Sequence, residues 1–513
     1  MQDRRTFLRR GAVTTAGGAL ALTPAAALAK KGRPAGFGSP VADRNGLIDL
    51  PRGFNYRVVQ NVEDRLTSGP AKDAPVPGDF DGMVAMRGPK NNSVMLVRNH
   101  ELTSTFERDK PFFGDASKAP VPHVNPYDDS SIGGTTGVVV GPNRKHAESF
   151  VTNSGTSTNC AGGGTPWGTW LTCEETRFEG GQGHGYVFEV DPHDPANDLS
   201  RTPIRAMGFF SHEAVDIDPR TGIAYLTEDD FRGPQVDADQ EVPGTTRSSF
   251  LYRYLPNNRA QRPGALQDGG QLQVMAIDQR PLFNMDLGET GQRFQVVWKD
   301  VSAETAHEDA LAQGGARFQR LEGCHFAGGA FWFDDTSGGE KRHGQLFRLI
   351  PSGDPSGGGT DTLELFLEGE SREQMDSPDN LVMTPWGDLW FCEDGDGIQR
   401  IMGVTPEGQT YEFARNRLVG KDSPDDDASE FAGPTFSPDG RTFFVNIQSP
   451  GHTFAIWGPF ARRNAGGQRA MASAPPQHRW APKVSPELRE YAAKNDMSPY
   501  EAAAYERLGV TLV

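Results

Sequence analysis

Residues 159–175 read NCAGGGTPWGTWLTCEE, and this stretch decides the fold. A first segment runs from Asn159 into a turn at Pro166 and Gly168, and a second, aromatic-rich segment ends on two carboxylates. Two short runs separated by turn residues of this kind are typical of a β-hairpin. The stretch therefore predicts two antiparallel strands, with the acidic end of the second returning to the level at which the first began.

The same hairpin pattern recurs along the 513-residue chain. Its other copies are FDGMVAMRGPKNNSVMLVRNHE (80–101), HEAVDIDPRTGIAYLTEDD (212–230), LEGCHFAGGAFWFDD (321–335), PDNLVMTPWGDLWFCED (378–394) and FAGPTFSPDGRTFFVN (431–446). Hairpins repeated about every 50 residues are typical of propeller blades. We therefore expect an all-β, six-bladed β-propeller over residues 30–463, with further outer strands at 186–190, 250–254, 345–350 and 362–367. A two-sheet sandwich is the alternative, but it would not repeat one strand ending six times.

Composition agrees with a turn-rich β protein. The chain has 61 Gly and 38 Pro, well above average usage, which disfavours an all-helical fold. Its formal net charge of −17 disfavours nucleic-acid binding, which depends on neutralising phosphates with basic side chains. Its four cysteines, Cys160, Cys173, Cys324 and Cys392, are too few for a disulfide scaffold, and the sequence leaves open whether the last three pair.

Both ends of the chain depart from the β pattern. Residues 1–29 combine paired arginines at 4 and 5, a weakly apolar run and an Ala-Leu-Ala cleavage pattern, which predicts a twin-arginine export signal. We therefore expect a protein handled by the twin-arginine translocase and located in the periplasm or secreted. Residues 464–513 are predicted to form a short helical tail, with helix starts at Ser485 and Ser498. The least repetitive stretch, 256–305, suggests a small separate lobe.

The repeats place reactive side chains in one register. Cys160, Glu213 and Asp379 each lie six residues before a turn proline, and Glu322 takes the corresponding place in the repeat that lacks the proline. The innermost strands of a propeller surround a central channel, so we expect these four side chains to meet at its mouth. The second strands return toward the same end with the acids Glu101, Glu174, Glu175, Glu228, Asp229, Asp334, Asp335, Glu393 and Asp394.

So many carboxylates cannot all ionise close together without compensating cations. Ca²⁺, which takes six to eight oxygen ligands, fits them, whereas a thiolate ligand suggests an additional transition metal. Acids that merely cap turns at strand ends are the simpler alternative for each residue taken alone. Arg320, two residues before Glu322 on the same face of an extended strand, either clamps a phosphate or neutralises the acids.

These motifs together carry a family resemblance. The twin-arginine leader, NCAGGGTPWGTWLTCEE, SHEAVDIDP (211–219), AYLTEDD (224–230), RLEG (320–323), SPDNL (377–381) and WFCEDG (390–395) resemble the PhoX-type bacterial alkaline phosphatases. The resemblance runs from about residue 47 to about residue 459. It implies a monomeric six-bladed propeller, exported folded, that hydrolyses small phosphate esters. It also implies two Fe³⁺ ions and two to three Ca²⁺ ions linked by a bridging oxo group.

The resemblance also implies roles for individual residues. Cys160 corresponds to a thiolate ligand of iron, and Arg320 to the arginine that binds phosphate. Glu174, Glu175, Glu213 and Glu322 correspond to carboxylate ligands shared between iron and calcium. Register alone adds Asp379 and Glu228 to the predicted metal ligands.

Two other classes of protein remain open at this stage. One is a calcium-dependent propeller lactonase or phosphotriesterase, which needs no thiolate ligand. The other is a non-catalytic, metal-stabilised propeller that binds a partner. We expect no membrane span, because no further long apolar stretch occurs in the chain.

Overall fold

The computed structural model describes residues 35–104, 118–178, 181–230, 247–418 and 429–460, all within one compact unit that begins at Ala35. This part of the chain is all-β, with a single α-helix, α1 (Ala306–Gln313), and four short 3₁₀-helices. The 3₁₀-helices are η3 (Asp198–Arg201), η4 (Arg205–Met207), η5 (Ala265–Asp268) and η6 (Met285–Leu287).

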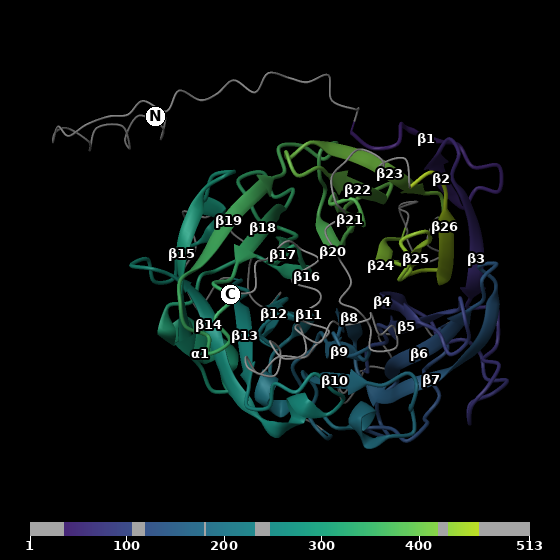
Figure 1. Cartoon of the computed structure of the whole chain (residues 1–513), viewed down its shortest axis with the longest axis horizontal. Coiled ribbons are helices and arrows are strands. Elements are labelled where there is room, and N and C mark those ends of the chain that lie inside the picture. Colours follow the sequence, from purple (N-terminus) through teal and green to yellow (C-terminus); the bar gives the residue numbers. More distant parts are fainter. Residues whose placement is uncertain (1–34, 105–117, 179–180, 231–246, 419–428, 461–513) are drawn as a thin grey trace, which may run out of the picture. The chain divides into compact units, whose positions relative to one another are not determined.

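The described strands form five antiparallel sheets arranged around a common centre (Figure 1). Two are four-stranded: β4 (Phe80–Arg87), β5 (Val94–His100), β6 (Gly133–Val140) and β7 (His146–Thr156) in one; β24 (Phe431–Phe436), β25 (Phe443–Ile447), β26 (His452–Trp457) and β3 (Asn55–Asn61) in the other. A three-stranded sheet contains β8 (Asn159–Gly164), β9 (Trp170–Glu174) and β10 (Val187–Val190). A six-stranded sheet contains, in spatial order, β1 (Pro40–Val41), β2 (Ile48–Pro51), β23 (Thr410–Asn416), β22 (Arg400–Val404), β21 (Leu389–Glu393) and β20 (Pro378–Met383).

The fifth sheet has nine strands and joins two meanders. The first is β11 (His212–Ile217), β12 (Ala224–Glu228), β13 (Leu251–Pro256) and β14 (Gly270–Ile277). The second is β16 (Leu321–Ala327), β17 (Ala330–Asp335), β18 (Gln345–Ile350) and β19 (Asp361–Glu368). Strand β15 (Arg293–Asp300) pairs with β14 on one side and β19 on the other. The prediction of a separate lobe over 256–305 is therefore wrong, because β14 and β15 are part of the nine-stranded sheet.

Six strands lie nearest the centre: β4, β8, β11, β16, β20 and β24 (Figure 1). Within the described residues, each contacts the next in chain order, and β24 contacts β4, so the ring closes. Strand β3, from the early part of the described chain, pairs with β26, which lies near its end. The six inner strands are edge strands of their sheets, and the closed ring protects these short edges by turning them toward the centre.

Each inner hairpin contains the same irregularity. Near the start of every inner strand the pairing skips one residue, as between Phe80 and Met83 of β4, which forms a β-bulge. A bulge leaves one residue unpaired and re-aims its side chain. Adjacent inner strands also approach closely: a Cβ on Gly323 would lie 2.6 Å from the carbonyl oxygen of Asp379. Glycine at this position is therefore required for the ring to pack.

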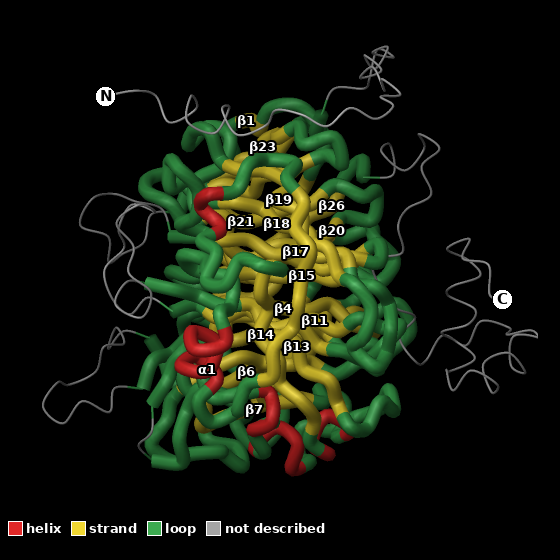
Figure 2. The backbone as a smooth tube through the Cα atoms, turned by 90° about the vertical axis from the view of Figure 1, so that its left-hand side faces the viewer, coloured by secondary structure: helices red, strands yellow, loops and turns green. Residues whose placement is uncertain are grey.

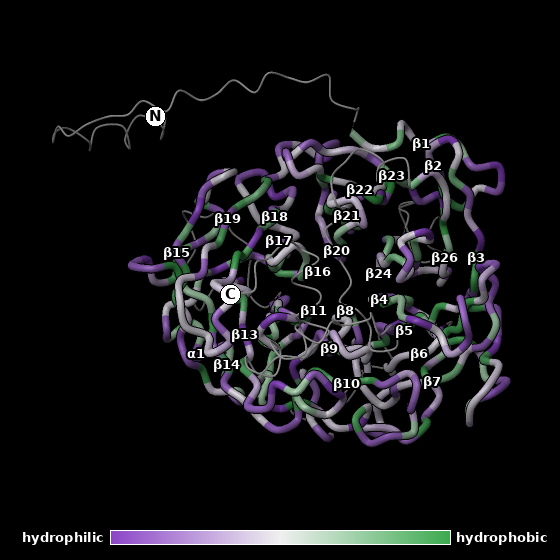
Figure 3. The backbone as a smooth tube through the Cα atoms, viewed as in Figure 1, coloured by the Kyte–Doolittle hydropathy of each residue, from purple (hydrophilic) through white to green (hydrophobic). Residues whose placement is uncertain are grey.

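Apolar cores separate the successive meanders. One example packs Trp390 and Phe413 of the six-stranded sheet against Phe443 and Phe454 of the last sheet. Viewed from the side, the strands form the middle of the unit, with loops on either side (Figure 2). Hydrophilic residues concentrate on the outer loops (Figure 3). No helix among the described residues is long and apolar enough to cross a membrane.

The all-β prediction and the propeller-like arrangement are thus confirmed, and the four predicted outer strands correspond to β10, β13, β18 and β19. The count of six blades stays a prediction, because the described sheets number five. The predicted signal at 1–29 and the predicted tail at 464–513 lie outside the described residues.

Candidate metal centre

The bulges place one chemically active side chain at the second position of five inner strands. These residues are Asp81 of β4, Cys160 of β8, Glu213 of β11, Glu322 of β16 and Asp379 of β20. The second position of the sixth inner strand, β24, is Ala432, whose side chain offers no ligand atom. Register therefore brings four carboxylates and a thiol to one level of the central ring.

Residues just beyond the second strands complete the site. Glu101 follows β5 and Glu175 follows β9. Three overlapping groups have ligand atoms within 4.8 Å of one another: Asp81–Glu101–Cys160, Cys160–Glu175–Glu213 and Glu213–Glu322–Asp379. We call these seven residues the central acid cluster. Cys160 and Glu213 each belong to two groups, and the Cys160 Sγ lies 3.1 Å from Glu213 Oε1.

Burial makes this cluster electrostatically costly. Burial, and then repulsion from Glu322 and Glu175, raises the pKa of Glu213 well above its usual range. Burial together with Glu101 and Asp379 does the same for the pKa of Asp81, and burial raises the pKa of Glu101 to about 7. Ionising the cluster at neutral pH therefore requires positive charge from outside these seven side chains.

The cluster has donor atoms available for a cation. The buried oxygens Asp81 Oδ1 and Glu213 Oε2 accept no hydrogen bond in the described part of the chain. Buried polar atoms without partners are rare in native structures and call for an explanation such as an ion. Carboxylate oxygens suit Ca²⁺, and the Cys160 sulfur suits a softer transition metal. The side chains present therefore fit the mixed metal centre expected from the sequence.

Arg320 is held at the edge of the cluster by two carboxylates. Its Nε lies 3.0 Å from Asp229 Oδ2, and its Nη2 lies 2.6 Å from Glu322 Oε1. Burial lowers the pKa of Arg320, but Glu322 and Asp229 outweigh this effect and raise it. Its Nη1 makes no hydrogen bond within the described residues, and the side chain is 26% exposed. One guanidinium nitrogen therefore remains available to a ligand.

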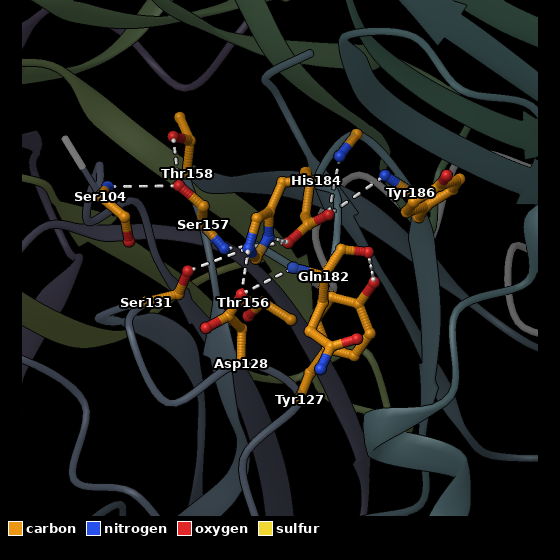
Figure 4. A network of polar contacts seen from close by, with 12 residues as sticks. Ser104, Tyr127, Asp128, Ser131, Thr156, Ser157, Thr158, Gln182, His184 and Tyr186 are labelled. Atoms are coloured by element: carbon orange, nitrogen blue, oxygen red, sulfur yellow. Dashed lines mark hydrogen bonds and ion pairs between the residues drawn. The ribbon is translucent and has the colours of Figure 1, made fainter. Parts of the chain in front are cut away.

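Glu174, a sequence-predicted metal ligand, lies outside the cluster. Its two oxygens accept hydrogen bonds from the Ser157, Gly185 and Tyr186 backbone amides and contact His184 Nδ1 at 2.7 Å (Figure 4). Burial alone lowers the pKa of His184, but the hydrogen bond and charge of Glu174 outweigh it and raise this pKa. These contacts occupy the Glu174 carboxylate, whereas Glu175 beside it belongs to the central acid cluster.

Glu228, predicted from register alone, also lies elsewhere. Its Oε1 contacts His307 Nδ1 at 2.8 Å, and Tyr252 donates a hydrogen bond to its Oε2 at 3.1 Å. With Asp230 and His307, Glu228 forms a separate group whose ligand atoms lie within 4.8 Å of one another and could hold a metal ion. The physical reason is the pleat: Glu174 and Glu228 pair directly with inner-strand residues, whereas the residue after each turns toward the centre.

The sequence interpretation omitted two residues of the cluster from the predicted ligands. The sequence pattern places Glu101 near the channel without assigning it as a ligand, and it does not identify Asp81. The Asp81 hairpin reaches its proline, Pro89, eight residues later rather than six, so alignment on proline missed it. The sequence feature that identifies Asp81 is the dipeptide Asp81-Gly82. It matches Glu322-Gly323 in residue type and in its position in the bulge.

The four cysteines are all free and buried in the structure. Cys173 packs in the apolar core between β8–β10 and β11–β14, and Cys392 packs in the core that contains Trp390. Burial, with Asp81 and Glu213, raises the pKa of the Cys160 thiol well above its usual range. Of the four, Cys160 is the one that belongs to the central acid cluster.

Fold and site together define a class: an all-β, propeller-like protein with a buried cluster of carboxylates and one thiol at its centre. The chain matches the family described as "Alkaline phosphatase PhoX" over residues 35–147 and 135–451, and it belongs to that family. A search of curated proteins found no match.

Two solved structures illustrate distant similarity. A gluconolactonase from Xanthomonas campestris, XC5397, is 13% identical, with 83% of this chain and 99% of that chain covered and a TM-score of 0.40. The holo form of the pyranose dehydrogenase PQQ domain from Coprinopsis cinerea is 9% identical, with 80% and 97% covered and a TM-score of 0.32. Likeness at this level carries no inference about activity.

Proposed function

We propose that this protein is an exported alkaline phosphatase that hydrolyses small phosphate monoesters at a metal cluster held by the central acid cluster. The observation that carries the proposal is the group of seven ligand residues, five buried and two half-buried. In this group the described residues give no hydrogen-bond partner to Asp81 Oδ1 and Glu213 Oε2. Membership of the PhoX family supports the reaction class. An anionic phosphate ester would be repelled by a chain of net charge −17, but bound cations would make the site itself positive.

The cofactor we propose is two Fe³⁺ ions with two to three Ca²⁺ ions. Cys160 would supply the sulfur ligand, and Glu175, Glu213, Glu322 and Asp379 would supply oxygens, joined by Asp81 and Glu101. When bound, such a cluster supplies Lewis-acid charge that polarises phosphoryl oxygens and lowers the pKa of water. Glu174 is left out of the proposed ligands, because His184 and backbone amides engage its oxygens. Glu228 is not assigned to this cluster, because it lies in a separate group with Asp230 and His307 that could itself hold a metal ion.

Arg320 is the proposed phosphate-binding residue. Asp229 and Glu322 hold its Nε and Nη2, which fixes the plane of the guanidinium. The orientation of Nη1, the nitrogen proposed to bind phosphate, is thereby fixed as well. A donor fixed in this way stabilises negative charge on a phosphoryl oxygen without reorganising during the reaction. No nucleophilic side chain is required by this arrangement.

The remaining features of the proposal concern architecture and location. We propose six blades, counting the nine-stranded sheet as two meanders linked by β15, because six inner strands close the ring. We also propose a monomer, exported folded through the twin-arginine pathway to the periplasm or beyond. Folded export would allow metals to be inserted before the protein crosses the membrane.

Elemental analysis and phosphatase assays on the purified protein test this function. We expect iron and calcium together, hydrolysis of 4-nitrophenyl phosphate, and loss of that activity on chelation with recovery on adding Ca²⁺. Calcium without iron, with lactonase or phosphotriesterase activity, would favour the second enzyme class. Absence of both metals and of hydrolysis would favour a non-catalytic binding protein.

Arg320 variants test the phosphate contact separately from metal binding. We expect Arg320→Ala to retain its metals but to weaken inhibition by inorganic phosphate and lower kcat/KM by tens- to thousands-fold, the cost of truncating a desolvated charge pair. Arg320→Lys should recover part of this loss, because an ammonium cannot reproduce the planar contact. Loss of the metals with unchanged phosphate inhibition per intact site would make Arg320 a structural counter-ion.

A further inference from the structure

A polar cavity of about 430 Å³ lies beside the central acid cluster. Three loops form it: the β17–β18 loop, the β19–β20 loop and the loop that follows β21. Its charged lining residues are Lys341, Arg342, His343, Arg372, Asp376, Asp394 and Asp396. No apolar side chain lines it among the described residues, so the cavity offers little to an aromatic or fatty group.

Backbone pairing connects this cavity to the proposed metal centre. The Asp394 amide donates a hydrogen bond to the Ser377 carbonyl at 2.9 Å, and both residues line the cavity. Ser377 lies two residues before Asp379 of the central acid cluster. The charges of Asp379 and Arg320 also act on the Asp394 carboxyl, so this wall of the cavity adjoins the cluster. We take the cavity as the space nearest the cluster for the alcohol portion of a bound phosphate ester.

Asp376 is the distinctive group in this cavity. Its side chain is 12% exposed, yet the nearest cations, Arg372 Nη1 and His343 Nδ1, lie 3.8 and 3.9 Å away. The described residues give its carboxylate no hydrogen bond, whereas nearby Glu393 accepts hydrogen bonds from Arg400 and from the Asp376 amide. Glycine at 395 leaves room for it, since a Cβ there would lie 2.5 Å from Asp376 Oδ2.

The chemistry of the lining selects a ligand class. A carboxylate with two open oxygens accepts hydrogen bonds from two neighbouring hydroxyls, and adjacent arginine, lysine and histidine groups donate to hydroxyl oxygens. A second phosphate is disfavoured, because Asp376, Asp394 and Asp396 offset the basic side chains. Resting on the proposed function, we propose that the cavity is a subsite for a hydroxyl-rich leaving alcohol of the sugar or polyol class.

Substrate comparison in variants tests the subsite. The test variants are Asp376→Ala and Arg372→Ala, the second at a more exposed side chain. The control is Arg415→Ala, which removes a partly exposed arginine on β23 that is also paired with a nearby carboxylate. In both test variants we expect kcat/KM for glucose 6-phosphate to fall about tenfold relative to kcat/KM for 4-nitrophenyl phosphate, mainly through KM. A loss of this size corresponds to one hydrogen bond to a charged group. The control should leave the ratio unchanged. Equal losses on both substrates, or no loss, would overturn the proposal.

Glucose binding provides an independent measurement. Ligand-observed NMR should show saturable binding of free glucose to the wild-type protein, abolished in Asp376→Ala and retained in Arg415→Ala. If the protein hydrolyses no phosphate ester but still binds glucose in this way, the proposed function fails and the subsite stands. If it hydrolyses phosphate esters but shows no Asp376-dependent glucose binding, the subsite proposal fails alone.

Discussion

Two buried regions of this protein are built in opposite ways. Between the six-stranded sheet and the last sheet, an aromatic core stacks Trp390 on Phe413 at a centroid distance of 4.0 Å, and its polar atoms have partners, as where Trp390 Nε1 donates to the Tyr411 hydroxyl at 2.8 Å. At the centre, the acid cluster buries like charges, and the described residues offer no hydrogen-bond partner to Asp81 Oδ1 and Glu213 Oε2. The first region stabilises the fold by itself, whereas the second is stable in its ionised form only with added cations.

The largest expected difference between cysteines concerns Cys160 and Cys173, which lie in the same hairpin. Cys160→Ala should remove iron, any thiolate-to-iron colour and activity by several orders of magnitude, because it deletes the sulfur ligand of the proposed centre. Cys173→Ala should keep metals and activity, because Cys173 packs in an apolar core. Absorbance, iron content and turnover measure both variants. A colourless, iron-free wild-type protein with full activity would contradict the iron–thiolate assignment.

Adjacent glutamates sharpen the comparison between ligand and structural carboxylates. Glu175→Gln should lower metal content and activity at least tenfold with a small change in folding. Glu174→Gln should keep its metals but lower the free energy of unfolding by about 3 kcal/mol, the scale for breaking a buried ion pair, because His184 loses its nearest carboxylate. Elemental analysis and denaturant unfolding separate the two. The reverse outcome would return Glu174 to the metal ligands.

Trp390→Ala breaks the aromatic core without touching the cluster. Truncating a fully buried large aromatic side chain typically costs about 3–5 kcal/mol, and Trp390 is 0% exposed. We expect a corresponding fall in the free energy of unfolding, with metal content per folded molecule and kcat within twofold of wild type. Loss of metals in the folded fraction would show that the two regions are energetically coupled.

The pH dependence of the metal-free protein tests the electrostatic cost of the central acid cluster. Burial raises the pKa of Asp379 to about 6 and that of Glu101 to about 7, so the folded state binds more protons than the unfolded state above about pH 4. The free energy of unfolding should therefore fall as pH rises from 4 through 7, on the order of 3 kcal/mol for Asp379 alone at 1.36 kcal/mol per pKa unit. Thermal unfolding of chelated and metal-loaded protein measures this. A metal-free protein that becomes more stable over that range would contradict the charge repulsion inferred here.

Local pattern predicted much of the fold. The hairpins, their turns and the four outer strands follow from alternating apolar residues and Pro/Gly turns, which act within about ten residues of one another. Strand β15 escaped prediction because its role is to join two meanders far apart in sequence. Its outward position gives RFQVVWKD a mixed burial pattern with no repeated turn signal beside it.

The sequence by itself determined which residues could form the site: a repeated strand register carrying Cys160, Glu213, Glu322 and Asp379, with acids at the ends of the returning strands. Tertiary structure alone decided which of those acids face the centre. The bulge and the pleat turn Glu175 inward and Glu174 outward, and the closed ring brings Asp81 beside Cys160, which is 79 positions away in the chain. Side-chain direction at a strand end depends on a one-residue shift in pairing, and that shift is set by contacts between strands rather than by local composition.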